Sequence, residues 1–201
     1  MRNDLLNLVG DQETILYEGK PHKGCFIFES IFNPLLPFAI MWGAFDFFFV
    51  SQAFAYDSPM KLFMIPFMAF HLMPVWLYLG GALFSFLRYH HTFYVVSDHA
   101  VYVSKGVFTK TVQSKPFAEL SHVDLHRGMF DQWFGVGDII LTTNQMTRNN
   151  KADMIAINSI KNYEDVYRTV KKLQKDIYSD VMYPNDLRPE ENHGYRTKYR
   201  G

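Results

Sequence analysis

The sequence contains almost no cysteine and has no excess of charge of either sign. Cys25 is the single cysteine, which excludes an internal disulfide and a multi-cysteine zinc site. Twenty basic and twenty acidic residues give a formal net charge of +0, whereas general nucleic-acid binders carry a basic excess. We therefore expect no nucleic-acid partner. Because Cys25 lies beside an apolar stretch, we interpret it as a buried thiol rather than a nucleophile.

Motifs of nucleotide binding and nucleophilic catalysis are also missing. The sequence contains neither G-x-S-x-G nor G-K-[ST]. Gly135 and Gly137 have the G-x-G spacing of a phosphate loop, but a helical turn precedes them and an apolar strand follows, which reverses the order that a dinucleotide site requires. We predict that both glycines are structural and permit a positive φ and a bulge. Trp133 and Phe134 would anchor this turn, in the core or against a membrane.

The histidines do not form a convincing metal site. His122 and His126 lie on one predicted strand, about 13 Å apart along it, too far to chelate one ion together. His90 and His91 would point to opposite faces of the chain for the same reason of strand geometry. We predict no catalytic residue, no metal and no cofactor, and so no enzyme.

Two long apolar runs stand out near the start of the chain. Residues 31–56 contain one charge, Asp46, and residues 62–87 contain none. Each run holds 26 residues, and about 20 residues suffice for a helix to cross a bilayer. Only "DSPMK" links them. We therefore predict a transmembrane helical hairpin over residues 25–88, with spans at about 31–56 and 62–87.

The charged flanks of these runs predict the orientation. Arg2, Lys20 and Lys23 precede the first run and Arg88 follows the second, whereas the link contains only Lys61. The positive-inside rule then places both termini in the cytoplasm, in a multi-pass protein of the cell membrane. Residues 1–24 lack the apolar core of a signal peptide and are expected to form a cytoplasmic N-terminal segment.

Two polar residues within the predicted spans are expected to meet. Asp46 and His71 would both lie roughly 14–15 Å from the outer end of an antiparallel hairpin, at a helical rise of about 1.5 Å per residue. A carboxylate in hydrocarbon usually pairs and faces protein or water. We predict an Asp46–His71 pair. Two roles stay open for it: a hydrogen bond that fixes helix packing, or a proton-linked or partner-binding function.

After Arg88 the pattern changes to short β-branched and aromatic runs separated by turn residues, which predicts a meander of hairpins. The six expected strands are residues 89–96, 100–105, 107–115, 121–127, 138–144 and 152–158. An amphipathic helix follows, with apolar residues at three- and four-residue steps from Ile160 to Ile177. This domain is expected to cover residues 89–179, and the charged, proline-bearing tail 180–201 is expected to be disordered.

The order of these elements resembles the bacterial pleckstrin-homology (PH)-like membrane proteins, the bPH2 or DUF304 group that includes YdbS- and YdbT-like proteins. The resemblance rests on "YVVSDHAVYVSKGVF" and "LSHVDLHRGMFDQWFGVGDIILTT", in which Tyr94, Gly106, Phe134, Gly135 and Gly137 match the pattern. "ETILYEGKP" at 13–21 is similar to the segment that precedes the first span. The resemblance implies an α+β membrane protein with a PH-like β-barrel or sandwich capped by its C-terminal helix, and no enzymatic activity.

The predicted function is a non-catalytic, membrane-anchored PH-like module that binds a protein partner or organises an assembly, including a homo-oligomer. A strand edge, or the groove between sheet and helix, would be the docking surface. The segment "ETILYE" can itself fill such an edge. One alternative is an anionic-lipid-binding domain, whose contacts would be Lys105, Lys110, Lys171, Lys172 and Lys175. A weaker alternative is a transporter accessory subunit that depends on Asp46 and His71.

Overall fold

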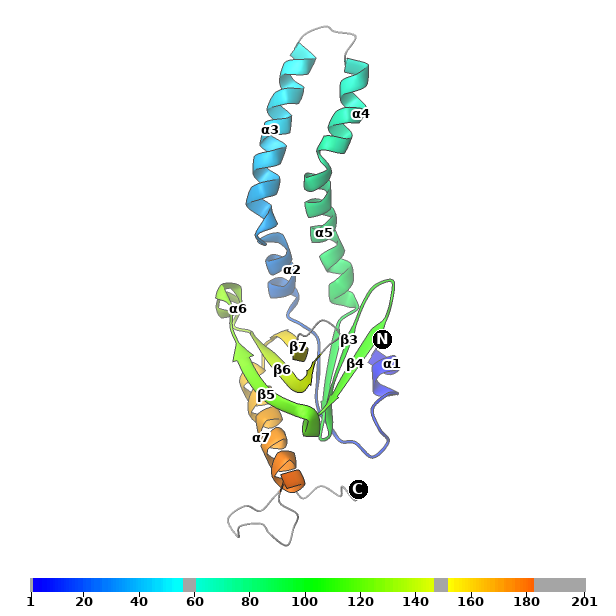
Figure 1. Cartoon of the computed structure of the whole chain (residues 1–201), viewed down its shortest axis with the longest axis vertical. Coiled ribbons are helices and arrows are strands. Elements are labelled where there is room, and N and C mark those ends of the chain that lie inside the picture. The colour runs from blue at the N-terminus through cyan, green and yellow to red at the C-terminus, as the bar shows by residue number, and fades with distance from the viewer. Residues whose placement is uncertain (1, 56–60, 147–151, 183–201) are drawn as a thin grey trace. The chain divides into compact units, whose positions relative to one another are not determined.

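A computed structural model describes residues 2–55, 61–146 and 152–182 of the chain (Figure 1). The chain forms two compact units. One unit contains Met1–Cys25 and Arg88–Gly201, and the other is Phe26–Leu87. We call them the β-domain and the helical unit and describe each by itself.

The β-domain contains two antiparallel sheets (Figure 1). The first has the order β1-β2-β3-β4, formed by β1 (Ile15–Gly19), β2 (Phe93–Ser97), β3 (Ala100–Lys105) and β4 (Thr111–Pro116). The second has the order β5-β6-β7, formed by β5 (Leu120–His126), β6 (Gly137–Met146) and β7 (Ala152–Ile160). The 3-10 helix η1 (Phe117–Glu119) connects the sheets, and the short helix α6 (Met129–Phe134) connects β5 to β6. The six predicted strands therefore exist, with shifted ends.

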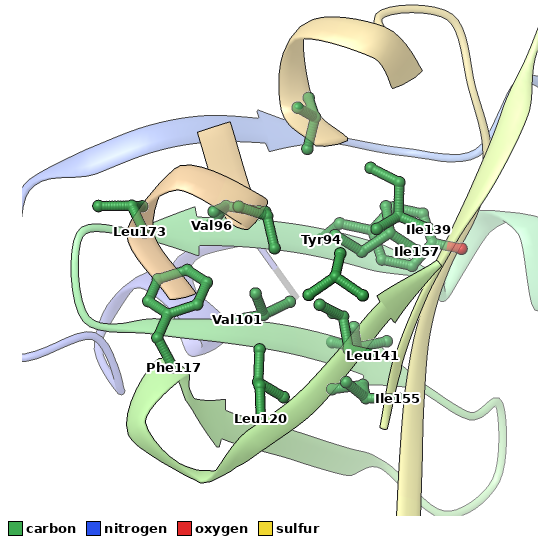
Figure 2. Packing of buried hydrophobic residues seen from close by; sticks show 14 of the residues in the cluster. Tyr94, Val96, Val101, Phe117, Leu120, Ile139, Leu141, Ile155, Ile157 and Leu173 are labelled. Carbon is green, nitrogen blue, oxygen red and sulfur yellow. The ribbon is translucent and has the colours of Figure 1, made fainter. Parts of the chain in front are cut away.

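Alternate side chains of the strands point inward and fill the space between the two sheets. Val101 and Val103 of β3 point to the same side as Tyr94 and Val96 of β2, and they meet Ile139 and its neighbours from the second sheet (Figure 2). Helix α7 (Tyr163–Met182) adds Val166, Val170 and Leu173, the buried stripe of its amphipathic face. Burial of these apolar side chains is the main source of the domain's stability.

The N-terminal segment is part of the β-domain, which differs from the partition expected from the sequence. Strand β1 pairs with β2, so that Tyr17 lies opposite Val96 and Gly19 opposite Tyr94. Helix α1 (Arg2–Leu6) places Leu5 in a second apolar cluster, on the β2 and β3 residues that face away from the main core. Residues 1–24 are therefore not a separate segment, because strand pairing between distant parts of the chain leaves no local sequence signal. The suggestion that "ETILYE" fills a sheet edge is confirmed.

The first part of the helical unit is interrupted earlier than predicted. Helix α2 (Lys23–Ile31) ends before Pro34, and α3 (Leu35–Ala55) begins after it. Pro34 has no backbone N–H and disfavours a helical conformation at Asn33. The Asn33 side chain instead accepts a hydrogen bond of 2.8 Å from the N–H of Leu35, which caps α3. Helix α3 is therefore shorter than the span expected at 31–56, since Ile31 belongs to α2.

The second apolar run forms two helices rather than one. Helices α4 (Lys61–His71) and α5 (Met73–His90) are separated at Leu72 by a bend of 50°. Pro74 lies just beyond this break, where the missing N–H of proline favours a new helix start. Within the described residues, one helix is long and apolar enough to cross a membrane, at Leu35–Gln52, and the bent pair α4 and α5 qualifies only if it is one span.

Two expectations fall wholly or partly outside the described residues. The link between the apolar runs includes residues 57–60, and the tail expected from residue 180 includes 183–201; neither range is described. Helix α7 continues to Met182, so the first residues assigned to the tail are helical.

Candidate functional site

The helical unit brings together the two polar residues that the sequence analysis paired. Asp46 of α3 is 1% exposed, and its Oδ1 lies 2.8 Å from Nδ1 of His71 at the end of α4. The His71 ring stacks on Trp42 at a centroid distance of 5.0 Å, and the Trp42 indole donates a hydrogen bond of 2.9 Å to the His71 carbonyl oxygen. The second carboxylate oxygen, Asp46 Oδ2, is buried and has no hydrogen-bond partner among the described residues. This arrangement joins α3 to α4 through a carboxylate, an imidazole and an indole.

The five lysines proposed for lipid contact do not form one surface. Lys105 and Lys110 flank the turn from β3 to β4, since Lys105 pairs with Thr111. The other three are in the middle turns of α7, beside Gln174, whose amide donates hydrogen bonds to the carbonyl oxygens of Leu120 and Ser121 at the start of β5. That is the opposite end of the β-domain (Figure 1). One flat bilayer would therefore not meet both groups.

The individual lysines also differ in their surroundings. Burial lowers the pKa of Lys105, whose side chain is half-buried. Lys171 is exposed and donates a hydrogen bond of 2.9 Å to the hydroxyl of Tyr167, which raises the pKa of this lysine. Lys172 and Lys175 are exposed.

The turn around the two glycines is a helix followed by a strand, as its residue order predicts. Gly135 ends α6 with φ of +64°, a left-handed conformation that favours glycine. Gly137 has no positive φ; a side chain there would lie 2.9 Å from the ring of Tyr163, and the register of β6 shifts beside it. Close packing, rather than a special backbone angle, therefore requires Gly137. Phe134 packs on His22 at 5.6 Å, whereas Trp133 is 73% exposed and does not anchor the turn in the core.

A hydrogen-bonded cluster at the turn from β2 to β3 was not identified from the sequence. The Glu13 carboxylate accepts hydrogen bonds from the hydroxyls of Ser97, at 2.5 Å, and Tyr102, at 2.9 Å. Asp98 accepts one from the Thr14 N–H, and His99 Nδ1 lies 2.7 Å from the same carboxylate oxygen. Burial, and then Glu13, raise the pKa of Tyr102 to about 12. Because Glu13 is distant in sequence from the turn, only the strand character of "ETILYE" pointed towards it.

Two groups in the β-domain bring potential metal ligands within 4.8 Å of one another. They are Glu13, Asp98 and His99, and His126, Asp131 and Asp138. Their carboxylates already accept protein hydrogen bonds. Asp131 accepts from the Gly128 N–H and lies 3.4 Å from the Cys25 thiol, and Asp138 accepts from the Ser159 N–H. We therefore interpret both groups as turn-stabilising networks rather than metal centres.

A groove between β1 and α7 is the concave feature of the β-domain that best fits a binding role. It has a volume of about 170 Å³ and is lined by Leu16, Tyr17, Val96, Asn162, Asp165, Val166 and Thr169. Strand β1 is an edge of its sheet, and the register shift between Ile15 and Tyr17 places Leu16 in a bulge, 45% exposed. Burial raises the pKa of Tyr17, so its phenol stays neutral. The groove thus combines a strand edge, an apolar floor and polar side chains at its rim.

Comparison with known proteins supports one family. No curated protein and no solved structure matches the chain. A sequence model described as the bacterial PH domain matches residues 45–174, which is more than half of the 201 residues. The matched range begins inside α3, contains β2 to β7 and reaches into α7, and its two antiparallel sheets with a C-terminal helix agree with a PH-like fold. The chain belongs to the bacterial PH domain family.

Proposed function

We propose that this protein is a non-catalytic PH-like binding module, anchored at the cytoplasmic face of a membrane, whose β1–α7 groove takes an extended segment of a protein partner. The groove carries the proposal. An edge strand offers backbone groups to an added strand, and a neighbouring pocket then selects one of its side chains. Small-molecule sites usually have volumes of about 300–1,000 Å³. A groove of about 170 Å³ is better suited to one aliphatic side chain than to a complete small ligand.

The residues of the groove define the kind of segment that fits. Leu16 and Val166 provide apolar surface for the inserted side chain. Asp165 is exposed in the first turn of α7 and favours a basic residue of the partner beside it. Exposed charge pairs contribute little to affinity but help to set register. The partner segment is therefore a short extended stretch with an aliphatic residue next to a lysine or arginine.

Membrane anchoring is supported by the apolar surface of α3. The stretch Leu35–Gln52 is only 11% buried, and Phe47 and Phe48 on it are 75% and 62% exposed. An apolar surface of this kind on a soluble protein would be a liability, whereas lipid satisfies it. In this proposal the bent pair α4 and α5 returns the chain, which gives two crossings and cytoplasmic termini. Resistance to alkaline carbonate extraction, and protection of a Lys175→Cys variant from an impermeant thiol reagent in intact cells, test anchoring and orientation.

Photo-crosslinking in native membranes tests the groove. We would place a photoreactive residue at Asn162, at the rim of the groove, in the full-length chain. A discrete crosslinked product is expected, and Leu16→Glu should abolish it because the bound segment would cover a carboxylate at this position and leave it without a hydrogen-bond partner. The matched control is Leu8→Glu, because Leu8 is 57% exposed and does not line the groove. The proposal fails if Leu16→Glu leaves the product unchanged, or if Leu8→Glu removes it equally.

A further inference from the structure

The ends of the strands define the place where the β-domain meets the rest of the chain. Residues 20–22 follow β1 and lead into α2, and the chain returns from α5 directly into β2. The end of the β-domain that contains Gly19, Phe93 and the β3–β4 turn is therefore the end where both connections emerge. We call it the connector end.

Helix α6 is fixed to the same end by contacts within the β-domain. The Cys25 thiol lies 3.4 Å from Oδ1 of Asp131, and a side chain at Gly24 would lie 3.1 Å from the Phe134 ring. The His22 N–H donates a hydrogen bond of 2.6 Å to the Ser159 carbonyl oxygen, near the end of β7. Helix α6 is thus attached to the last residues before α2 continues into the helical unit.

Two elements at the connector end expose large apolar side chains. Phe108 in the β3–β4 turn is 90% exposed, and Met129 and Trp133 on α6 are 66% and 73% exposed. Among the described residues of the β-domain, no phenylalanine other than Phe108 and no tryptophan other than Trp133 has an exposed side chain. Neither side chain belongs to the core clusters of the β-domain, and on α6 it is Phe134 that packs on the His22 ring.

Exposed basic residues also lie at the connector end. Lys20 lies on the connection from β1 to α2, and Lys23 is the first residue of α2. Lys110 lies in the β3–β4 turn, and Lys161 follows β7. Asp131, the acidic residue of α6, is 1% exposed and does not oppose them at the surface. Exposed tryptophan and phenylalanine together with lysine are typical of protein surfaces that lie at the membrane interface, between the lipid headgroups and the acyl chains.

We propose that the connector end is a membrane-contacting surface, in which Phe108 on one side and Met129 with Trp133 on the other enter the interfacial layer of the bilayer. The lysines at this end contact anionic headgroups. Contacts from two separate elements prevent the domain from pivoting on its connections, and they hold the β1–α7 groove in one orientation to the membrane. The inference rests on the proposed anchoring, because both connections between the β-domain and the apolar helices leave the domain at this end.

Spin labels on the full-length chain test this surface directly. The chain would be reconstituted in vesicles of phosphatidylethanolamine and phosphatidylglycerol, with Cys25→Ser as the background, since a serine hydroxyl can still donate to Asp131. Labels at Phe108→Cys and Trp133→Cys are compared with a control at Lys175→Cys, which is exposed on the second half of α7. We expect high collision with oxygen and low collision with a water-soluble nickel chelate at the first two sites, and the reverse at the control.

A second variant tests whether the native aromatic side chains, rather than the spin label itself, cause insertion into the bilayer. With a label at Met129→Cys, the combined substitution Phe108→Ser and Trp133→Ser should raise nickel accessibility several-fold while the chain remains resistant to carbonate. Nickel accessibility equal to that of Lys175→Cys at both original sites would overturn the inference. The labels could also be protected from both oxygen and nickel, to a degree that increases with the protein-to-lipid ratio. That result would overturn the inference too, because it would show that the surface contacts a protein or a second copy of the chain. Extraction of the unsubstituted chain by carbonate would instead overturn the anchoring itself.

Discussion

Asp46 and His71 are joined across α3 and α4 by a hydrogen bond of 2.8 Å, although 25 residues separate them in the sequence. The carboxylate is almost completely buried, at 1% exposure, and the histidine is held from its other side by the Trp42 ring. A buried carboxylate without a donor would be strongly unfavourable in an apolar surrounding. The pair therefore specifies how the two helices pack, whatever further role it has.

A double-mutant cycle measures this coupling. Asp46→Ala and His71→Ala should each destabilise the full-length protein in detergent. The double variant should lose less than the sum, by on the order of 1 kcal/mol, as is typical of hydrogen bonds between membrane helices. Reversible unfolding provides the free energies. The control cycle combines His71→Ala with Ser51→Ala, because the Ser51 hydroxyl bonds within its own helix to Phe48. Equal coupling in both cycles would show that the Asp46–His71 contact has no specific energetic role.

Local patterns in the sequence predicted the elements whose neighbours in space are also neighbours in sequence. Alternation in "AVYVSK" placed β3, and the three- and four-residue steps from Ile160 placed α7. The pair Asp46 and His71 followed from a hairpin with a short link, because the distance of each residue from that link is simple arithmetic. These predictions needed only helical rise, strand period and chain connectivity.

Other features depend on contacts that no local pattern contains. Strand β1 pairs with β2, although the whole helical unit separates the two strands in the sequence. Glu13 therefore contacts Tyr102 without any sequence signal at either residue. Lys105 and Lys175 are far apart because of the direction in which α7 runs along the domain. Hydrophobic periodicity predicts that α7 is a helix, but it does not predict this direction. The break at Pro34 was accessible from the sequence, since proline and a preceding asparagine commonly end one helix and cap another.

Gly106 and Gly135, which both have a positive φ, should differ in their sensitivity to alanine. At Gly106, φ is +111°, and a side chain would clash with the Thr109 carbonyl oxygen. At Gly135, φ is +64° and the space is open. Gly135→Ala should cost about 1 kcal/mol, the penalty for a left-handed residue alone. Gly106→Ala should cost clearly more, because the β3–β4 turn must also rearrange. Denaturant unfolding of the full-length variants gives both values, and equal costs would contradict the clash at Gly106.

Ser159 is a strained residue whose replacement should stabilise the protein. It has φ of +54°, and its Oγ is buried without a hydrogen-bond partner among the described residues. Its backbone is fixed in place because its N–H donates to Asp138 at 2.6 Å. Ser159→Gly removes both the hydroxyl and the left-handed penalty, whereas Ser159→Ala removes only the hydroxyl. We expect the glycine variant to be more stable than the alanine variant by roughly 1 kcal/mol. A ranking with alanine above glycine would contradict the backbone conformation at this position.

The tyrosines of the β-domain predict a loss of stability in alkaline solution. The pKa of Tyr102 is raised from 10.0 to about 12, first by burial and then by Glu13. Burial also raises the pKa of Tyr94. A pKa that is higher in the folded state means that the folded protein retains the phenol proton more tightly. Its contribution to stability is therefore complete below pH 10 and is lost as the pH rises from 10 towards 12.

Glu13→Gln isolates the contribution of the charge. A glutamine can still accept the Tyr102 hydroxyl hydrogen bond but carries no negative charge, so the pKa of Tyr102 should fall towards 10 without reaching it, because burial remains. The difference in tyrosinate absorbance between each chain and the same chain carrying Tyr102→Phe reports this one ionisation among twelve tyrosines. Unfolding free energies measured across the same pH series should decline less steeply for Glu13→Gln than for the unsubstituted protein. An unchanged pKa of Tyr102 in Glu13→Gln would contradict the contact between the Glu13 carboxylate and the Tyr102 hydroxyl.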